Sequence, residues 1–364
     1  MNVCIIGEGL TALSLAKSLI NKKINVHYYY KSRNSNFSSN RTIGISKSNF
    51  EFFKEKIFQI SKNNYWKINR IEIYTDKIDT ENLLKFENDK NDLFYIIKND
   101  ELLKSLNSNL IKSKFFKKII LSKNINEEFL NKKEYDLIIN CDANNFLAKK
   151  YFTKKISKNY YNLAYTTILK HKKIENNTAT QIFTKQGPIA FLPISSTETS
   201  VVYSMDIKNK KFDNSDVIDL INKNNPKYLI NKIDKLNSFE LSSSNLRNYY
   251  HKNILAFGDM LHRVHPLAGQ GFNMTIRDLR ILTKIIEDKI ELGMQLDLQI
   301  FDEFEKKTKD KNFVFSKAID LIYESFNLDK KVQNKSFSKI LKSIGKNKNL
   351  NNYFIKLADT GINF

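Results

Sequence analysis

The chain has little of what marks several large classes of protein. Its 364 residues include only two cysteines, four prolines and one tryptophan, and no apolar run is long enough to span a bilayer. Two distant cysteines are too few for a disulfide framework or a metal knuckle. Cys4 and Cys141 each lie in or beside an apolar run, so we expect two buried thiols in a reducing cytoplasm. Residues 1–20 lack a basic segment, so we do not expect a signal peptide.

Negative charge is also scarce. The formal net charge is +21, from 60 basic and 39 acidic residues, and such an excess can serve nucleic acid or an anionic membrane surface. Only seven of the basic residues are arginines, however, and the lysines are scattered along the whole chain. No motif that reads RNA or DNA is present. The composition therefore argues against specific nucleic-acid binding and favours weak attraction to an acidic lipid surface.

The most informative stretch that is present runs over residues 258–273 and reads GDMLHRVHPLAGQGFN. An apolar run at 254–257 precedes it and predicts a strand, and apolar residues at helical spacing over 276–286 predict a helix after it. The stretch is thus a strand, a carboxylate, a stiff proline turn and a glycine-rich helix start. An ordinary strand–turn–helix corner needs one glycine, and it does not also need an acid, a proline and an asparagine.

Each part of this stretch suits a bound ligand. Asp259, at the strand end, can accept hydrogen bonds from a sugar hydroxyl. Gly269 and Gly271 let the backbone approach a flat or anionic group. The helix start presents free N–H groups and the positive end of its dipole to the same group. The stretch therefore predicts a ligand site rather than a structural corner alone.

A second glycine-rich joint lies at the start of the chain. Residues 2–6 read NVCII and predict a buried strand, a helical pattern follows, and residues 24–30 predict a second strand. Gly7, Gly9 and Ala12 fit the G-x-G-x-x-A dinucleotide fingerprint at this β-α-β joint. The first glycine makes the tight turn, the second lets a pyrophosphate approach, and the alanine keeps helix and strand close.

Other candidate contacts are more open. Tyr30 or Lys31 stands where an acid would normally hold the adenosine ribose, so that contact is not predicted. Arg41 follows a polar loop and serves either as a contact to an anionic cofactor or substrate, or as a solvated loop arginine. Asp142 ends an apolar strand at 135–141, and it is either a second strand-end ligand or a solvated acid.

The middle of the chain has a different texture. Residues 162–241 contain short β-rich runs divided by turns, and this pattern predicts an antiparallel sheet that forms a layer separate from the nucleotide domain. The chain returns to the first domain at Ile254, so we expect that domain to be discontinuous. The tail, 301–364, is mostly helical with lysine-rich faces. Its expected buried positions are Leu321, Ile322, Phe326, Ile340 and Leu341.

These motifs resemble the FAD-dependent aromatic-ring monooxygenases, most closely the branch that hydroxylates ubiquinone precursors. Residues 258–273, continued by Arg277-Asp278, are similar to that branch's G-D-A-A-H-x-x-x-P-x-A-G-Q-G-x-N motif. Residues 186–193, QGPIAFLP, resemble its G-P-I-A-x-L-P signature. Residues 41–46 resemble its R-x-x-x-L-S element, and residues 7–12 its first FAD motif. The matches follow the family's order from the start of the chain to about residue 278.

The resemblance implies an α/β fold, α+β overall. It consists of a discontinuous Rossmann-like FAD-binding domain, an inserted antiparallel β-sheet substrate domain and a helical C-terminal tail. We expect the FAD-binding domain to comprise residues 1–65, 98–155 and 250–300, the substrate domain residues 66–97 and 156–249, and the tail residues 301–364. The flavin is expected at the interface of the first two.

The resemblance also implies the site and its chemistry. The cofactor-binding residues it implies are Gly7, Gly9, Leu10, Thr11, Ala12, Arg41, Asp142, Gly258, Asp259, Pro266, Ala268, Gly269, Gln270, Gly271, Phe272 and Asn273. The family reduces FAD with NAD(P)H, forms a flavin hydroperoxide with O₂ and transfers one oxygen to a phenol ring. The expected substrate is a polyprenylated phenolic lipid of ubiquinone biosynthesis, with other enzymes of that pathway as partners. The expected location is cytoplasmic and peripheral on the inner face of the membrane.

Some positions depart from the family pattern. The middle motif D-G-x-x-S-x-x-R reads here with Ala143, Phe146 and Lys149 at its second, fifth and eighth positions. These departures leave an alternative open, a flavin-binding or scaffold subunit of a quinone-biosynthesis complex with little turnover of its own. His262 and His265 are three residues apart, but no third ligand is near, so we expect a structural or hydrogen-bonding pair and no metal. No catalytic side chain is predicted.

Overall fold

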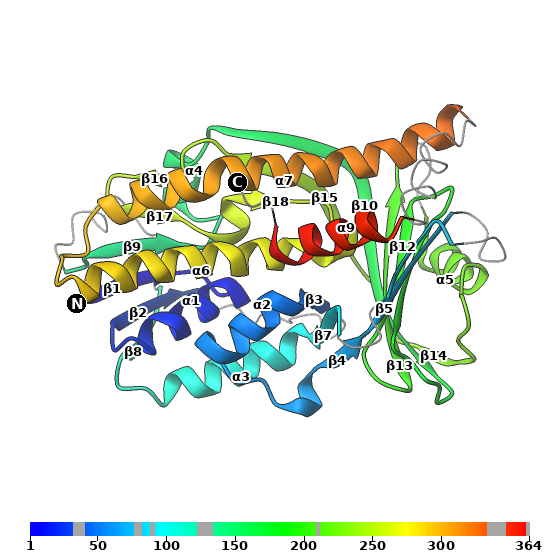
Figure 1. Ribbon diagram of the computed structural model, residues 1–364, viewed down its shortest axis with the longest axis horizontal. Helices are drawn as coiled ribbons and strands as arrows, with labels where there is room; N and C mark the ends of the chain where they lie inside the picture. The colour runs from blue at the N-terminus through cyan, green and yellow to red at the C-terminus, as the bar shows by residue number, and fades with distance from the viewer. Residues whose placement is uncertain are drawn as a thin grey trace.

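The computed structural model describes residues 1–31, 41–75, 82–87, 92–121, 134–208, 212–332 and 347–361. Within these ranges, the side chains of Ala268, Lys348 and residues 327–332 lie outside the described set. The described part of the chain forms three sheets with helices packed around them (Figure 1).

A six-stranded sheet forms the half of the molecule that holds the N-terminus. Its strands are, in spatial order, β16 (Tyr250–His251), β17 (Ile254–Ala256), β9 (Leu137–Asn140), β1 (Asn2–Ile6), β2 (Asn25–Tyr30) and β8 (Phe116–Ile120). All neighbours pair in parallel except β16 and β17. Parallel strands need both faces covered, which explains why the central strands are continuous apolar runs.

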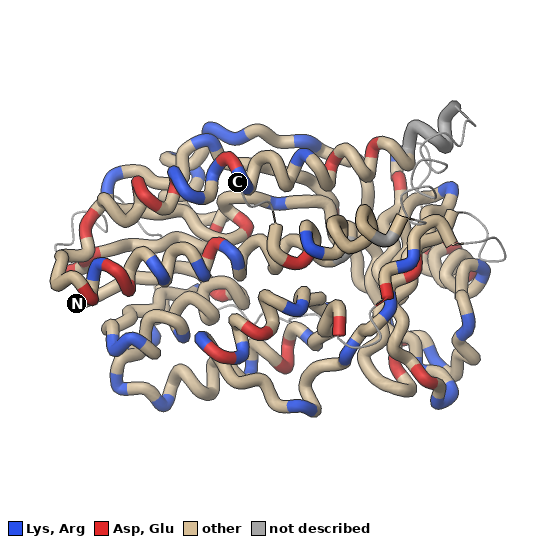
Figure 2. The backbone as a smooth tube through the Cα atoms, viewed as in Figure 1, with Lys and Arg blue, Asp and Glu red and all other residues tan. Residues whose placement is uncertain are grey.

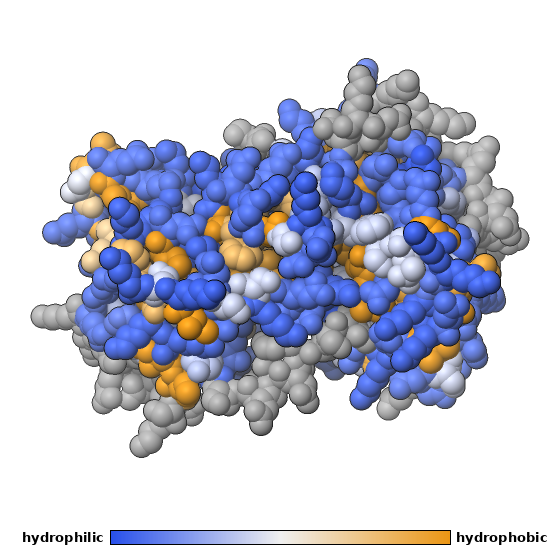
Figure 3. All heavy atoms as spheres, turned by 90° about the horizontal axis from the view of Figure 1, so that it is seen from below, coloured by the Kyte–Doolittle hydropathy of each residue, from blue (hydrophilic) through white to orange (hydrophobic). Residues whose placement is uncertain are grey.

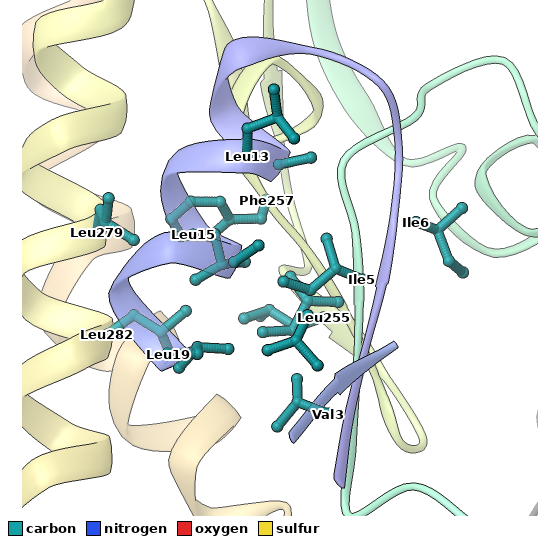
Figure 4. Close-up of a cluster of buried hydrophobic side chains, with 14 of the residues drawn as sticks. Val3, Ile5, Ile6, Leu13, Leu15, Leu19, Leu255, Phe257, Leu279 and Leu282 are labelled. Carbon is teal, nitrogen blue, oxygen red and sulfur yellow. The ribbon is translucent and has the colours of Figure 1, made fainter. Parts of the chain in front are cut away.

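Helices cover this sheet and form one large core with it. They include α1 (Leu10–Ile20), α3 (Asn99–Ile111), α4 (Phe146–Tyr151) and α6 (Gln270–Glu291). Figure 4 shows Leu15 and Leu19 of α1 between Ile5 of β1 on one side and Leu282 of α6 on the other. The apolar residues of 276–286 that predicted a helix are all buried on α6. The two glycine-rich joints are therefore held by one core, although about 260 residues separate them in the chain.

A second, larger sheet lies at the other end of the molecule (Figure 1). Its strands are β18 (His262–Arg263), β15 (Asn237–Leu246), β10 (Lys155–His171), β13 (Glu198–Asp206), β12 (Pro188–Pro193), β11 (Thr178–Phe183), β5 (Arg70–Thr75) and β6 (Leu84–Glu87), with β14 (Ile230–Ile233) on β10. Its strand pairs are antiparallel, as expected, except that β11 and β5 run parallel. α5 (Asn214–Lys223) belongs to this half.

A third sheet joins the two halves. It contains β3 (Thr42–Ser46), β7 (Phe94–Lys98) and β4 (Trp66–Ile68), in that order and antiparallel. α2 (Lys47–Phe52) follows β3 and continues as a π-helical turn, Phe53–Ile57. The two ends of segment 66–97, β4 and β7, thus pair with each other and, through β7, with β3. Of the strands in this segment, only β5 and β6 belong to the large sheet. The expected division into an FAD-binding domain and a substrate domain stays a prediction. The small sheet lies between the sheets of these two domains (Figure 1).

The tail consists of α7 (Gln299–Val332) and α9 (Lys348–Thr360). α7 runs along both halves of the molecule (Figure 1). The prediction that Leu321 and Ile322 are buried is wrong, because their exposed fractions are 64% and 42%. The buried side of α7 includes Ile319, Tyr323 and Phe326 instead. Of the three positions on this helix that were predicted to be buried, only Phe326 is confirmed. Ile340 and Leu341 lie outside the described residues.

In the view of Figure 2, basic and acidic residues are interspersed along the backbone in both halves of the molecule. On the face seen in Figure 3, apolar side chains form separate patches among polar ones. Among the helices that the structure describes, none combines the length and the apolar character needed to cross a membrane.

Candidate cofactor and substrate site

One cavity of about 1080 Å³ lies where the three sheets meet. Pockets that hold one drug-sized ligand usually measure about 300–1,000 Å³, so this space, just above the upper end of that range, suits a large cofactor together with part of a second molecule. The start of α1, β3 and the start of α6 line one side. Strands β5, β10, β11, β12 and β15 of the large sheet line the opposite side, and α9 lines a further part of the wall.

The N-terminal end of α1 opens onto this cavity. Its N-cap, Gly9, has no side chain to cap the helix, and Gly9, Leu10, Thr11 and Ala12 all line the space. A β-carbon at Gly9 would meet no atom within 4 Å, so the backbone there is open to a ligand. Unpaired N–H groups and the positive end of the helix dipole at this point favour an anionic group.

The N-terminal end of α6 opens onto the same cavity. Gly269 is its N-cap in the left-handed conformation, with φ of 64°, and again no side chain caps the helix. Gln270 and Gly271 follow and line the space, as do Pro266 and Phe272. A β-carbon at Gly271 would also meet nothing within 4 Å. Two helix starts from distant parts of the chain thus present free backbone donors to one ligand-sized space.

Two predicted glycines lie behind the cavity wall, outside its lining. Gly7 has φ of 141°, and a β-carbon there would lie 3.0 Å from Cβ of Cys141. Gly258 has φ of 69°, and a β-carbon there would lie 2.5 Å from Cγ2 of Thr11. Both positions therefore need glycine for the backbone angle and for a close contact, and at Gly258 that contact joins the two glycine-rich motifs.

Asp259 and Arg41 are the charged residues among the predicted contacts that reach the cavity. Asp259 is exposed on a short 3-10 helix, Gly258–Met260, and lines the space. The guanidinium of Arg41 lines it as well and stands 5.7 Å over the ring of Phe239 on β15. Arg41 is exposed as well as part of the lining, so a contact to cofactor or substrate stays a prediction beside the alternative of a solvated loop arginine.

Three predicted contacts have other positions or other partners. Asp142 is outside the cavity lining; its carboxylate accepts a hydrogen bond from the Asn144 backbone N–H at 2.8 Å and lies 4.0 Å from Nζ of Lys31. The side chain of Ala268 lies outside the described residues. Asn273 is fully buried, and its side chain makes its hydrogen bonds to other residues of the protein.

The contacts of Asn273 explain its place in the motif. Its Nδ2 donates to the carbonyls of Gly44 and Gly269, at 3.0 and 3.1 Å. Its Oδ1 accepts from the Ser46 backbone N–H at 2.9 Å and from Asn49 Nδ2 at 3.2 Å. Asn273 thus ties β3 to the start of α6 and holds two walls of the cavity in register.

The two cysteines differ in exposure. Cys4 is buried as expected, whereas Cys141 is only partly covered and lines the cavity, so the prediction of two buried thiols is half right. Although the residue as a whole is partly exposed, desolvation of the thiol, together with the nearby carboxylates of Asp259 and Asp142, raises the pKa of Cys141 well above its ordinary value and keeps it uncharged at neutral pH.

The comparisons with known proteins agree with this geometry. Residues 160–291 match the family model described as FAD binding domain. The ubiquinone biosynthesis monooxygenase COQ6 of Caenorhabditis elegans is 25% identical over 197 residues, 43% of this chain and 44% of that protein. The 3-demethoxyubiquinol 3-hydroxylase of Escherichia coli K12 is 26% identical over 153 residues, 40% of this chain and 39% of that protein. In four COQ6 relatives the chain spans about half the protein's length or less.

Solved structures show the same fold. The p-nitrophenol 4-monooxygenase PnpA of Pseudomonas putida DLL-E4 has a TM-score of 0.78 at 11% identity, over 100% of this chain and 98% of that one. HpxO of Klebsiella pneumoniae, solved with FAD and uric acid, has a TM-score of 0.76 at 12% identity, over 99% and 97%. The chain is related to the FAD-dependent aromatic-ring monooxygenases of ubiquinone biosynthesis.

The predicted family, fold class and FAD cofactor are thereby confirmed. The residues that line the cavity of this chain also fit FAD by their geometry, independently of the comparisons. The glycine-lined start of α1 suits a pyrophosphate, and the cavity has room for a ring system beside α6. Oε1 of the buried Gln270 has no partner among the described residues, so it is free to accept from an N–H group.

The two histidines of residues 258–273 have different partners. His262 lines the cavity, and its Nε2 lies 2.6 Å from Oδ2 of the buried Asp278. The other oxygen of Asp278 accepts from Asn312 of α7 at 2.9 Å. His265 packs between Tyr160 and Tyr323, and burial lowers its pKa to about 3. Among the described residues, no group of three potential ligands could hold a metal.

Sequence reasoning missed two parts of the site. Asp278 was noted only as the end of a motif, because nothing local shows that it holds His262. α9 was assigned to a basic tail, although Asn351, Phe354, Ile355 and Ala358 recur at helical spacing and the last three line the cavity. That spacing was the available signal, but only the tertiary structure shows what the helix faces.

Proposed function

We propose that the protein is an FAD-dependent monooxygenase that hydroxylates the aromatic ring of a polyprenylated phenol in ubiquinone biosynthesis, with NAD(P)H and O₂. One observation carries the proposal: two uncapped helix starts, at Gly9 and Gly269, open onto one cavity whose opposite wall is largely apolar strand. The related COQ6 proteins and the 3-demethoxyubiquinol 3-hydroxylase support this choice of reaction.

The chain's own groups divide the work of binding. The N–H groups at the start of α1 would hold the pyrophosphate, and Asp259 would accept hydrogen bonds from the ribityl hydroxyls. The N–H groups near Gly269 and Gly271 would stabilise negative charge on the flavin ring when it is reduced. When bound, FAD supplies the redox chemistry, taking electrons from NAD(P)H and using O₂ to oxidise the phenol.

The apolar side of the cavity would place the substrate. Ile71 and Ile73 of β5, Leu192 of β12 and Val202 of β13 line it. Such a surface holds an aromatic ring and its lipid tail and excludes water from the reaction space. Arg41, beside Phe239, would meet an anionic oxygen of substrate or cofactor.

The test is the visible spectrum of the purified protein under anaerobic conditions, before and after addition of NADPH, with and without a prenylated phenol. We expect a flavin spectrum that bleaches, followed by hydroxylated product when O₂ is admitted. Purified protein that binds FAD and is reduced, yet never hydroxylates any prenylated phenol, would contradict the proposed substrate. Protein that binds no FAD would contradict the site as well.

A second function is favoured by one observation. The middle motif departs from the family pattern at Ala143, Phe146 and Lys149, and Asp142 lies outside the cavity lining. A flavin-binding or scaffold subunit of a quinone-biosynthesis complex would tolerate these changes. It predicts a bound flavin that NADPH and NADH leave oxidised in every condition, and co-purification with other enzymes of the pathway.

Weak contact with an anionic membrane surface also belongs to the proposal, because the substrate is a lipid and the chain carries a net charge of +21. Co-sedimentation with vesicles containing acidic lipids tests it. We expect binding that 0.5 M salt abolishes, because the Debye length falls from about 10 Å at 0.1 M salt to roughly 4 Å at 0.5 M and the charged contacts are screened. Equal sedimentation with neutral and acidic vesicles would contradict an electrostatic contact.

A further inference from the structure

α9 contributes to the cavity although it belongs to none of the motifs that point to FAD, and it lies outside residues 160–291 of the family match. Asn351, Phe354, Ile355 and Ala358 follow i, i+3, i+4, i+7 spacing, so they share one face of the helix. The last three line the cavity. In Figure 1, α9 lies between α6 and the strands of the large sheet.

Polar contacts hold the two ends of this helix. Near its C-terminal end, Oδ1 of Asp359 accepts from the backbone N–H and from the hydroxyl of Ser48, at 2.8 and 2.9 Å. The hydroxyl of Ser46 donates to the Asp359 carbonyl at 3.2 Å. Near its N-terminal end, Nδ2 of Asn351 donates to the carbonyl of Lys85 on β6, at 2.8 Å. α9 therefore connects the cofactor side of the cavity to the large sheet.

The helix has little core of its own. None of its described side chains is buried, and Phe354 and Ile355 are only partly covered, on the side where the cavity lies. Two large apolar side chains are thus held against an open space instead of against protein. A ligand with an apolar surface would complete their burial, which is the main source of affinity in such sites.

We propose that α9 is the substrate-selecting wall of the cavity, and that Phe354 and Ile355 contact the isoprenoid part of the substrate. The inference rests on the proposed function and names the residues that recognise the lipid tail. The acid of α9 that faces the cavity, Asp359, is tied to Ser48, so the surface offered by the helix is apolar. Ile71 and Ile73 of β5 provide apolar surface in the same cavity.

The experiment measures binding to the FAD-loaded protein without turnover. Two ligands are titrated, a simple phenol and the same phenol with a short isoprenoid tail, and the Kd of each is read from the change in the flavin spectrum. The variants are Phe354→Ala and Ile355→Ala. The matched controls on the same helix are Tyr353→Ala and Leu350→Ala, whose side chains are 62% and 44% exposed and do not line the cavity.

We expect each cavity variant to weaken binding of the tailed phenol about tenfold, the scale set by losing apolar contacts in a pocket. Binding of the simple phenol, flavin content and both control variants should stay as in the wild type. Because truncation can disturb the helix, Ala358→Phe provides a second test that adds bulk at an exposed position. It should also weaken the tailed phenol selectively, by filling the space.

The outcomes separate this inference from the proposed function. If the wild type prefers the tailed phenol and all variants keep that preference, α9 does not select the substrate, while the proposed function stands. If the wild type binds FAD but shows no preference for the tailed phenol, the proposed lipid substrate is overturned, and the role of α9 with it. Equal loss of both ligands in the cavity variants would make α9 a structural support and overturn the inference alone.

Discussion

Gly258 packs against Thr11 so closely that a β-carbon at position 258 would lie 2.5 Å from Cγ2 of Thr11. This contact joins the start of the motif at 258–273 to the turn of the motif at 7–12. It places Asp259 and the first turn of α1 on one cavity, which is the arrangement that an extended cofactor with a pyrophosphate and a sugar chain requires.

Gly258→Ala is expected to destabilise the protein by about 2–4 kcal/mol and to lower its flavin content, because it adds a steric clash to an unfavourable φ of 69°. Gly293→Ala is the matched control, since Gly293 has φ of 66° but open space around it. It should cost only about 1 kcal/mol and leave flavin unchanged. Denaturant unfolding and the ratio of FAD to protein measure both effects; equal losses in the two variants would contradict the packing explanation.

Asp259→Ala is expected to give folded but colourless protein, because it removes the carboxylate proposed to hold the ribityl chain. The side chain is exposed, so its loss should change the free energy of unfolding by less than about 0.5 kcal/mol. Asp288→Ala removes an exposed acid paired with Lys284 on α6 and serves as the control. Absorbance at flavin wavelengths after gel filtration decides the question, and a yellow Asp259→Ala protein would remove this residue from the proposed role.

Asp278→Ala is expected to cost about 3–5 kcal/mol of stability, because it leaves the buried His262 and Asn312 without their common partner. Breaking the exposed Lys284–Asp288 pair by Asp288→Ala should cost less than about 1 kcal/mol, since exposed ion pairs contribute little. Equilibrium unfolding in guanidinium chloride compares the two. A similar small loss in both variants would show that the buried pair is not structural.

The stability of the protein is expected to depend on His265 at acid pH. Burial lowers the pKa of this histidine to about 3, whereas an unfolded histidine titrates near 6.5. Between these values the unfolded chain binds the extra proton, so this residue removes about 1 kcal/mol of stability per pH unit as pH falls. His265→Phe should flatten that part of the unfolding free energy between pH 7 and pH 5. Burial also lowers the pKa of the partly exposed His251, so His251→Gln is the comparison and should flatten the slope less than His265→Phe does.

The strands and helices that could be predicted from the sequence share one property, local periodicity. Residues 2–6, 24–30 and 276–286 form the elements that their apolar patterns indicate, since a strand or an amphipathic helix records its burial in its own spacing. The two glycine motifs also predicted their turns, because a left-handed φ or a close backbone approach restricts a position to glycine.

Long-range pairing could not be predicted in the same way. Which strands pair, such as β3 and β4 with β7, depends on segments brought together by the rest of the fold. The phase of α7 was also misjudged, because Leu321 and Ile322 are apolar yet face outward, and only the neighbours of a helix decide which stripe it buries.

The sequence by itself determined the chemistry of the candidate site, because backbone angles, helix starts and a strand-end acid are local properties of 7–12 and 258–273. The tertiary structure alone decided which of those groups share a cavity, that Asn273 holds its walls together, and that α9 forms part of it. The physical reason is that a cavity is made by packing between distant segments, and contacts between distant segments leave no periodic record in any one of them.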